Sequence, residues 1–192
     1  MGKRLSRIYT RSGDTGQTGL GTQGRVPKHD LRIQAMGDVD ELNSWIGHIR
    51  AALDADHDQT PVLSQIQHDL FDIGGELAMP GFDLVADTLV TDLERAIDQL
   101  NDALPPLDNF ILPAGSETTS RVHIARSVAR RAERQLWALH DQEQDVDTDD
   151  DQRVGLTSIQ YINRLSDYLF VLARTVARAD DGQEVLWQSR HQ

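Results

Sequence analysis

The sequence contains no cysteine among its 192 residues. This absence excludes a disulfide framework, a thiolate metal site and a cysteine nucleophile, and it is compatible with a reducing compartment. No apolar run is long enough to cross a membrane, and the first residues lead into no apolar signal-peptide segment. We therefore expect a cytoplasmic protein that has no membrane partner.

Positive charge is also scarce. The chain has 31 acidic side chains and 19 lysines and arginines, which gives a formal net charge of −12. Proteins that bind nucleic acid usually need an excess of positive charge, so nucleic acid is excluded as the main partner. In so acidic a chain, a local cluster of arginines indicates a bound anion.

Several common catalytic motifs are missing. No glycine run ends in Gly-Lys-Ser or Gly-Lys-Thr, so there is no Walker A loop. Gly19-Leu-Gly-Thr-Gln-Gly24 has the G-x-G-x-x-G spacing, but a polar glycine loop precedes it and no helix follows, so we reject a dinucleotide site. None of the 7 histidines lies three residues after a glutamate, and no two have zinc-ligand spacing, which argues against di-iron and zinc centres.

The apolar residues show helical periodicity in five segments. The expected helices span about Asp30–Leu53, Thr60 to the Pro80-Gly81 pair, Leu89–Leu104, a segment that contains Arg121–Arg134 and is capped by Ser116 or Thr118, and Thr157–Arg178. Short connections between such helices favour an all-α fold, an antiparallel five-helix bundle that is ferritin-like in architecture. We expect one domain over 1–192, with an N-terminal glycine-rich loop at 1–29, the bundle at 30–180 and a tail at 181–192. The acidic residues 141–151 are expected to form a solvated connection.

Three charged residues mark the fourth predicted helix. Arg126, Arg130 and Glu133 form a stripe beside its apolar face. Guanidinium groups suit a forked grip on phosphate oxygens and keep their charge at every relevant pH. The alternative is an ordinary helix surface in which arginine and glutamate pair at i, i+4 spacing.

Residues 8–28 combine glycine, hydroxyl side chains and cations. Five glycines make a helix improbable there, and they let backbone N–H groups approach a phosphate chain closely. The interleaved hydroxyls and the cations Arg11, Arg25 and Lys28 favour a phosphate cradle over a flexible tail, which is the other common outcome for this composition.

Two further helices carry polar stripes at the same offset from their apolar faces. These are Asp40, Asn43 and Gly47 on the first helix and Asn163, Ser166 and Phe170 on the last. An aspartate that leans toward the arginine helix would pair with it, although two unrelated polar rims would give the same pattern. The segment Phe110–Gly115 either plugs the bundle end or places an aromatic ring near the start of the arginine helix.

Several motifs, in order along nearly the whole chain, resemble one family. They are Tyr9-Thr-Arg-Ser-Gly-Asp-x-Gly-x-Thr-Gly-Leu20, Arg25-Val-x-Lys28, Gly37-x-Val-Asp-Glu-Leu-Asn-Ser44, Phe110-Ile-Leu-Pro, Arg126-x-x-x-Arg-Arg-Ala-Glu-Arg134 and Asn163-Arg-Leu-Ser-Asp-x-Leu-Phe170. The family is the PduO-type ATP:cob(I)alamin adenosyltransferases. Two positions depart from its usual pattern, since Ala114 stands where a glycine is common and Asp38 where a threonine is frequent.

The resemblance implies a homotrimer of five-helix bundles that binds ATP and a corrinoid (cobalamin or a precursor) between neighbouring subunits. Such an enzyme transfers the 5′-deoxyadenosyl group of ATP to cobalt(I) and releases triphosphate. By resemblance, the residues that bind the nucleotide and its phosphates are Thr10, Arg11, Gly13, Asp14, Gly16, Thr18, Lys28, Arg126, Arg130, Arg131, Glu133 and Asn163. Glu133 would also help to place a Mg²⁺ carried by the triphosphate. The implied catalytic residues are Arg126, Arg130, Asp40, which would pair with Arg126 across the interface, and Phe110, which would block the lower axial face of cobalt.

Two alternatives to the enzyme remain. A corrinoid carrier could keep the fold without turnover, but it would not need a grip for triphosphate. An acidic helical scaffold would leave the glycine-rich loop without a purpose. The resemblance also implies an electron-donating reductase as a partner and admits a client enzyme that uses the adenosylated product.

Overall fold

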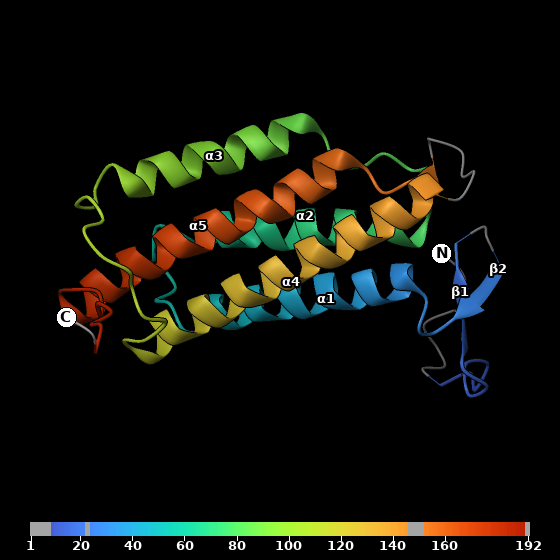
Figure 1. Cartoon of the computed structure of the whole chain (residues 1–192), viewed down its shortest axis with the longest axis horizontal. Coiled ribbons are helices and arrows are strands. Elements are labelled where there is room, and N and C mark those ends of the chain that lie inside the picture. The colour runs from blue at the N-terminus through green and yellow to red at the C-terminus, as the bar shows by residue number, and fades with distance from the viewer. Residues whose placement is uncertain (1–8, 22–23, 146–151, 191–192) are drawn as a thin grey trace.

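The computed structural model describes residues 9–21, 24–145 and 152–190, and the predicted five-helix bundle is confirmed (Figure 1). The helices are α1 (Leu31–Arg50), α2 (Thr60–Ala78), α3 (Asp87–Asn101), α4 (Glu117–Asp145) and α5 (Leu156–Asp181). The expected segments 1–29 and 181–192 lie partly outside the described residues, at 1–8, 22–23 and 191–192.

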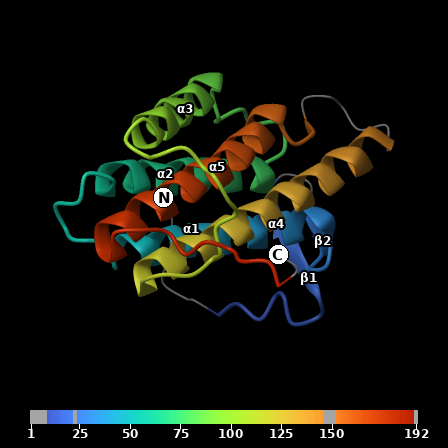
Figure 2. The same ribbon diagram turned by 60° about the vertical axis from the view of Figure 1, so that its left-hand side comes forward.

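Helix α4 is the centre of the arrangement, because it packs against α1 on one side and α5 on the other (Figure 2). Helix α2 packs against α1, and α3 lies against α5. The α4 residues that face the core are small or branched, and Ala125, Ala129 and Ala132 are completely buried. Small side chains let the helix backbones approach closely, so α4 can contact two neighbours along most of its length.

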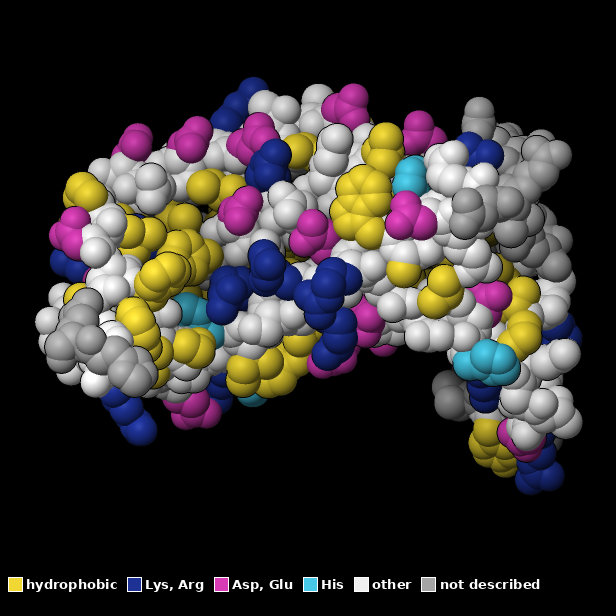
Figure 3. Space-filling view, in the orientation of Figure 1, with side chains coloured by type: hydrophobic (Ala, Val, Ile, Leu, Met, Phe, Trp, Pro, Cys, Tyr) yellow, Lys and Arg dark blue, Asp and Glu magenta, His cyan; other side chains and the backbone are white. Residues whose placement is uncertain are grey.

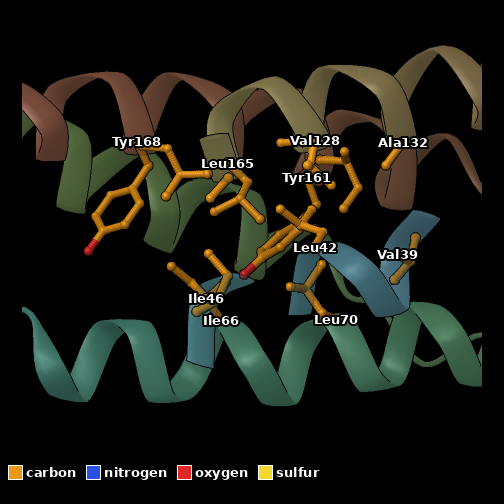
Figure 4. Packing of buried hydrophobic residues seen from close by; sticks show 14 of the residues in the cluster. Val39, Leu42, Ile46, Ile66, Leu70, Val128, Ala132, Tyr161, Leu165 and Tyr168 are labelled. Atoms are coloured by element: carbon orange, nitrogen blue, oxygen red, sulfur yellow. The ribbon is translucent and has the colours of Figure 1, made fainter. Parts of the chain in front are cut away.

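The core is one continuous cluster to which all five helices contribute. Side chains from α1, α2, α4 and α5 converge in it, among them Leu42, Leu70, Val128 and Leu165 (Figure 4). The predicted apolar stripes supply most of these residues. Met36, Leu53, Val62, Ile97 and Leu104 are only partly buried at its margin.

Two buried tyrosines bring polar groups into this core. The Tyr161 hydroxyl donates a 2.7 Å hydrogen bond to Asp69, whose other oxygen accepts one from Gln65. Burial, together with the negative charge of Asp69, raises the pKa of Tyr161, so the phenol keeps the proton that it donates. The Tyr168 hydroxyl likewise donates to Gln59. Buried polar groups of this kind stabilise a unique packing only when each one has a partner, as these do.

The N-terminal segment is more regular than expected. Strands β1 (Gln17–Leu20) and β2 (Gly24–Pro27) form an antiparallel hairpin in which Thr18 pairs with Val26. Gly21 lies directly against the end of α2. A Cβ atom at this position would come within 2.5 Å of the Ala78 carbonyl oxygen, so only glycine fits there. Gly21 also has φ +42, a conformation that favours glycine. Strand β1 is followed by β2, and not by a helix that begins in the Gly19–Gly24 segment.

The acidic segment 141–151 is not entirely a solvated connection. Helix α4 continues to Asp145, whereas residues 146–151 lie outside the described part of the chain. Glu143 is buried and forms a salt bridge with the buried Arg32 at the start of α1. Arg32 also donates to the carbonyl oxygen of Gln152, and Glu143 accepts from the backbone N–H of Val154. These contacts of Arg32 and Glu143, which we call the Arg32–Glu143 clamp, join the start of α1, the end of α4 and the segment before α5.

Among the residues described, no helix is both long enough and apolar enough to span a membrane.

We predict that Glu143→Ala lowers the free energy of unfolding by about 3 kcal/mol, because it leaves the Arg32 guanidinium buried without its counter-charge. Urea denaturation at 25 °C measures the change. The matched control is Glu117→Ala, which removes the i, i+4 partner of Arg121 at an exposed position and should cost less than about 1 kcal/mol. Equal losses in the two variants would contradict a special role for the clamp.

Candidate active site between α4, α5 and the C-terminal tail

Two arginines one turn apart on α4 have no counter-charge in the part of the chain that the structure describes. Arg126 is half-buried and Arg130, one turn later, is exposed, and neither forms an ion pair within the described residues. The Arg126 Nε atom is buried and has no hydrogen-bond partner there. Dark blue side chains gather over the middle of α4, beside a hydrophobic area toward the end of α5 (Figure 3).

The two guanidinium groups repel each other. Burial, and then the positive charge of Arg130, lower the pKa of Arg126. Arginine nevertheless keeps its charge at physiological pH, so the repulsion remains until an anion arrives. By contrast, Arg121 pairs with Glu117, and Arg131 pairs with Asp38 and Glu41 on α1. An unpaired pair of guanidiniums in a chain of net charge −12 is the arrangement that a phosphate chain would neutralise.

A cavity opens beside Arg126, with a volume of about 600 Å³. Its lining comes from the 107–111 loop, from His123 and Arg126 on α4 and from Phe170 on α5. Phe110 presents its ring to this space and is 77% exposed. The cavity therefore combines apolar side chains with polar ones, including the cation Arg126 and the carboxylate Asp108.

The chain after α5 holds the Phe110 loop in place. The backbone N–H of Trp187 donates to the Phe110 carbonyl oxygen at 2.8 Å, and that of Leu112 donates to Val185 at the same distance. The rings of Phe110 and Trp187 meet edge to face, with centroids 6.2 Å apart. Glu184 anchors this segment through ion pairs with Arg174 and Arg178 of α5. These contacts let the tail brace the 107–111 loop, which lines the cavity.

His123 was not predicted from the sequence. It lies one turn before Arg126, is only 4% exposed, and lines both this cavity and a second one beside Trp45 and Arg131. Its Nδ1 atom has no hydrogen-bond partner among the residues described. Burial, and to a lesser extent the charge of Arg126, lower the pKa of His123 to about 4, so the ring is neutral at physiological pH. A lone histidine on an otherwise apolar stretch gives no sequence pattern that would single it out.

The structure brings two predicted residues of different helices together. Asn163 of α5 donates a 2.9 Å hydrogen bond to Glu133 of α4, and its own carbonyl oxygen accepts one from Arg164. This contact occupies one oxygen of Glu133. The other oxygen has no hydrogen-bond partner among the described residues, and a carboxylate oxygen of this kind is a suitable ligand for a cation held by phosphate groups. No group of three or more possible metal-binding side chains occurs in the described part of the chain.

The predicted loop residues, by contrast, lie at the other end of the bundle (Figure 1). Thr10, Arg11, Asp14 and Gly16 are exposed, and the loop closes on itself through the bond from the Lys28 backbone N–H to the Gly16 carbonyl oxygen, at 2.9 Å. The Lys28 side chain lies over Gly13, where a Cβ atom would come within 3.2 Å of Nζ. Thr18 is half-buried on β1.

Helix geometry sets the distance between this loop and the arginines. The hairpin precedes α1, whose Arg32 contacts Glu143 near the end of α4. From Arg126 to Glu143 the helix rises about 25 Å, at 1.5 Å per residue. One chain therefore does not bring its own loop to its own arginines.

Asp40 forms no ion pair with the arginine helix of its own chain among the described residues, so its pairing with Arg126 across an interface stays a prediction. Asp40 is exposed and lines a different cavity of about 490 Å³ between α1 and α2, together with Gly37 and Phe71. The acids on α1 that do face α4 are Asp38 and Glu41, and the arginine that they engage is Arg131. The offset of one to two residues rotates Asp40 to the other side of α1.

Comparison with known proteins identifies the family of this chain. The family model described as cobalamin adenosyltransferase matches residues 8–176. The chain belongs to the cobalamin adenosyltransferase family.

Relatives of this family match the chain end to end. The cobalamin adenosyltransferase of Cupriavidus metallidurans is 50% identical, and the match covers 98% of this chain and 97% of that protein. The corrinoid adenosyltransferase of Mycobacterium leprae is 43% identical, with 98% of each chain covered. A solved variant of the PduO-type ATP:corrinoid adenosyltransferase from Lactobacillus reuteri, complexed with cobalamin and ATP, has a TM-score of 0.83 and 33% identity over 95% of this chain and 100% of that one. The five-helix architecture is thus the fold of the adenosyltransferases.

We predict that His123 makes this adenosyltransferase acid-sensitive. The unfolded ring takes up a proton near pH 6.5 and the folded ring only near pH 4, so stability is complete above pH 6.5 and falls as the pH drops between those values. His123→Leu should abolish this term, so the native protein should lose about 1–2 kcal/mol more unfolding free energy than the variant between pH 7.5 and pH 5. Urea unfolding at both pH values measures the difference, and parallel losses would refute the buried neutral ring.

Proposed function

We propose that this protein transfers the 5′-deoxyadenosyl group of ATP to the cobalt of a reduced corrinoid and releases triphosphate. The observation that carries the proposal is the pair of unneutralised guanidiniums, Arg126 and Arg130, at the edge of a partly apolar cavity that contains an exposed aromatic ring. The pair suits a polyphosphate, and the cavity beside it suits a large, flat, mostly apolar macrocycle.

The reaction is a displacement at carbon. Cobalt(I) attacks C5′ of ATP, the cobalt–carbon bond forms with the electron pair of the metal, and the C5′–O bond breaks to release triphosphate. The corrinoid supplies the nucleophile, so the protein needs none of its own. Its tasks are to align cobalt with C5′ and to stabilise the charge that accumulates on the leaving phosphate chain, which is the role we give to Arg126 and Arg130.

Phe110 has a separate role in this proposal. Cobalt(I) forms readily only when no lower ligand donates electrons to the metal. An aromatic ring held in the cavity by the tail can occupy the lower axial position and exclude such a ligand, and Phe110 is exposed there and braced by Trp187. Phe110 therefore assists the reduction that precedes transfer.

We infer that the complete site lies between two subunits of a homotrimer. The separation of the glycine-rich loop from the arginine pair within one chain supports this arrangement. The loop residues Thr10, Arg11, Gly13, Asp14, Gly16, Thr18 and Lys28 of one subunit would then wrap the nucleotide held by Arg126 and Arg130 of the next. Asp40 is exposed and unpaired among the described residues, so it is available to meet Arg126 of a neighbour. Phe71, which is 74% exposed beside it, supplies apolar surface for such a contact.

The remaining predicted residues fill supporting roles. Glu133, held by Asn163, would complete the coordination of a Mg²⁺ bound mainly by the triphosphate, because one carboxylate plus phosphate oxygens is a common magnesium environment. Asn163 would contact the nucleotide next to it. Arg131 remains a candidate phosphate ligand, although its ion pairs with Asp38 and Glu41 make it first a link between α4 and α1.

The proposal also includes partner enzymes and a cellular compartment. An electron-donating reductase must supply cobalt(I), and an enzyme that uses the adenosylated cofactor is the natural recipient of the product. A cysteine-free chain is compatible with the cytoplasm as the site of this chemistry.

The decisive assay combines cob(I)alamin, ATP and Mg²⁺ without oxygen and follows the visible spectrum as the cobalt–carbon bond forms. We expect turnover by the native protein, a loss of at least about a hundredfold in kcat for Arg130→Ala, and a smaller loss for Phe110→Ala. Arg121→Ala, on the same helix but paired with Glu117, is the control and should leave the rate unchanged. A folded protein that binds ATP and corrinoid without turnover would favour the carrier instead.

The shared site has its own test. Lys28→Ala and Arg130→Ala should each be nearly inactive, because each removes a phosphate-binding cation from every site. If a site joins the loop of one chain to the arginines of another, mixed oligomers should recover up to about a quarter of native activity, since that fraction of sites has both native halves on random mixing. Co-refolding the two variants in equal amounts makes this measurement. No recovery from well-formed mixed oligomers would place both residues in the same chain's site.

A further inference from the structure

The Phe110 ring needs support from outside its own loop. Residues 102–116 connect α3 to α4 and, apart from one β-bridge at Ile111, contain no helix or strand. A largely exposed ring on such an irregular connection has few contacts that fix its position. The proposed exclusion of a lower ligand, however, requires the ring to stay at one place in the cavity. Whatever holds this loop therefore affects the reduction of cobalt.

The tail supports the loop through a short antiparallel pairing. Ile111 and Leu186 form a β-bridge, and one backbone hydrogen bond between loop and tail lies on each side of it. The Asn109 side chain adds a third hydrogen bond, in which its amide nitrogen donates to the Trp187 carbonyl oxygen at 2.9 Å. A two-stranded pairing is at best marginally stable in water on its own, and Leu186 and Trp187 are exposed. The pairing therefore needs an anchor.

One buried arginine holds both partners of this pairing. The side chain of Arg174 on α5 is only 3% exposed, and its Nε atom pairs at 3.0 Å with Glu184, the residue directly before the paired part of the tail. A terminal nitrogen of the same guanidinium donates a 2.7 Å hydrogen bond to the carbonyl oxygen of Pro105, in the segment that leads to Phe110. None of the three contacting residues lines the cavity. Arg174 therefore joins loop and tail at a second place, outside the cavity.

Glu184 is the acid that completes this anchor. Its side chain is 8% exposed, and its second oxygen pairs at 2.6 Å with Arg178, one turn after Arg174. Burial would raise the pKa of this carboxyl, but hydrogen bonds with its own backbone and with the two arginines lower the pKa, so Glu184 is ionised at physiological pH. Gly182 ends α5 in the left-handed conformation, with φ +75, and turns the chain. This turn lets Glu184 reach arginines of the helix that precedes it.

We propose that Glu184 is a positioning residue for the reduction of the corrinoid, because its ion pairs with Arg174 and Arg178 dock the tail that fixes the Phe110 ring below cobalt. The inference rests on the proposed function and extends it to residues outside the cavity. In the step concerned, one electron passes from a reductant to cobalt(II) and gives cobalt(I), while the lower ligand leaves the metal. Loss of the Glu184 carboxylate releases the tail, frees the ring and lets the lower ligand return.

The first test is the coordination of cobalt(II) itself, which electron paramagnetic resonance reports directly. Cob(II)alamin bound to the native protein with ATP should show the spectrum of a cobalt without a lower ligand. Glu184→Ala should reduce the fraction of this species at least about threefold. A variant that melts at a lower temperature but keeps the native spectrum would show that the ion pairs serve stability alone, and would overturn the proposal.

The second test separates reduction from transfer. In an assay that starts from cob(II)alamin with reduced flavin as the electron donor, Glu184→Ala should be about tenfold slower than the native protein. In an assay that starts from chemically prepared cob(I)alamin, the two proteins should agree within about twofold. Equal losses in both assays would contradict a role in reduction. A native protein that is inactive even with cob(I)alamin would refute the adenosyltransferase proposal instead, so the two failures are distinguishable.

A cross-link tests whether Glu184 acts through the tail. Ile111 and Leu186 form a non-hydrogen-bonded antiparallel pair, for which a Cα separation of about 4.5 Å is typical and which a disulfide can span. The native chain has no cysteine, so Ile111→Cys and Leu186→Cys supply the only thiols of each chain. Added to Glu184→Ala, the disulfide should restore the native cobalt(II) spectrum, and its reduced form should not. A formed disulfide that restores nothing would overturn the proposal.

Glu94→Ala is the matched control. Glu94 of α3 also pairs with an arginine of α5, Arg164, at 2.7 Å, but neither residue lines the cavity or contacts the tail pairing. Its replacement should change both rates by less than about twofold and leave the cobalt(II) spectrum as it is. An effect as large as that of Glu184→Ala would show that the loss of any ion pair on α5 suffices, and would remove the special role of Glu184.

Discussion

The packing of α4 between α1 and α5 is the constraint on which the rest of the molecule depends. A face of buried alanines lets two helices approach α4 at once, and this close packing sets the rotation of α4 about its own axis. That rotation places Arg126 at the edge of the core and Arg130, one turn later on the helix, in an exposed position. Rotating the helix by one residue, about 100°, would send the first guanidinium into the core or both into open solvent.

Several buried polar groups away from the cavity are matched: Arg32 with Glu143, Tyr161 with Asp69 and Arg174 with Glu184. Others, such as the Gln135 Nε2 and His140 Nδ1 atoms, have no partner among the described residues. At the cavity, Arg126 and His123 each retain a buried nitrogen without a partner. Matched pairs hold the ends and the middle of the bundle, so the fold can tolerate these unsatisfied groups and the repulsion between Arg126 and Arg130. In the proposed reaction this preorganised charge would meet the phosphate chain of ATP with little rearrangement.

The sequence predicts the elements that depend mainly on residues close together in the chain. The helical periodicity of apolar residues in five segments predicts the five helices. The spacing of Arg126 and Arg130 alone shows that they share one edge of a helix. The hairpin at Gln17–Pro27 was missed because its glycines weaken any strand pattern, and because its turn depends on a contact with the distant Ala78 carbonyl. The sequence does not show which acid of α1 faces α4, because Asp38, Asp40 and Glu41 lie within four residues and only the rotation of α1 decides between them. His123 differs from an ordinary surface histidine only in its burial and its missing hydrogen-bond partner, which are properties of the folded state.

The pairing of the tail with the Phe110 loop has a consequence for the order in which the protein is made. Residues 185–187 are synthesised after all five helices, yet they bond to Phe110 and Leu112 and brace the ring at the cavity. A nascent chain could therefore complete all five helices before the loop that carries Phe110 gains these contacts. The position of the Phe110 ring is then fixed last, when residues 185–187 reach the loop.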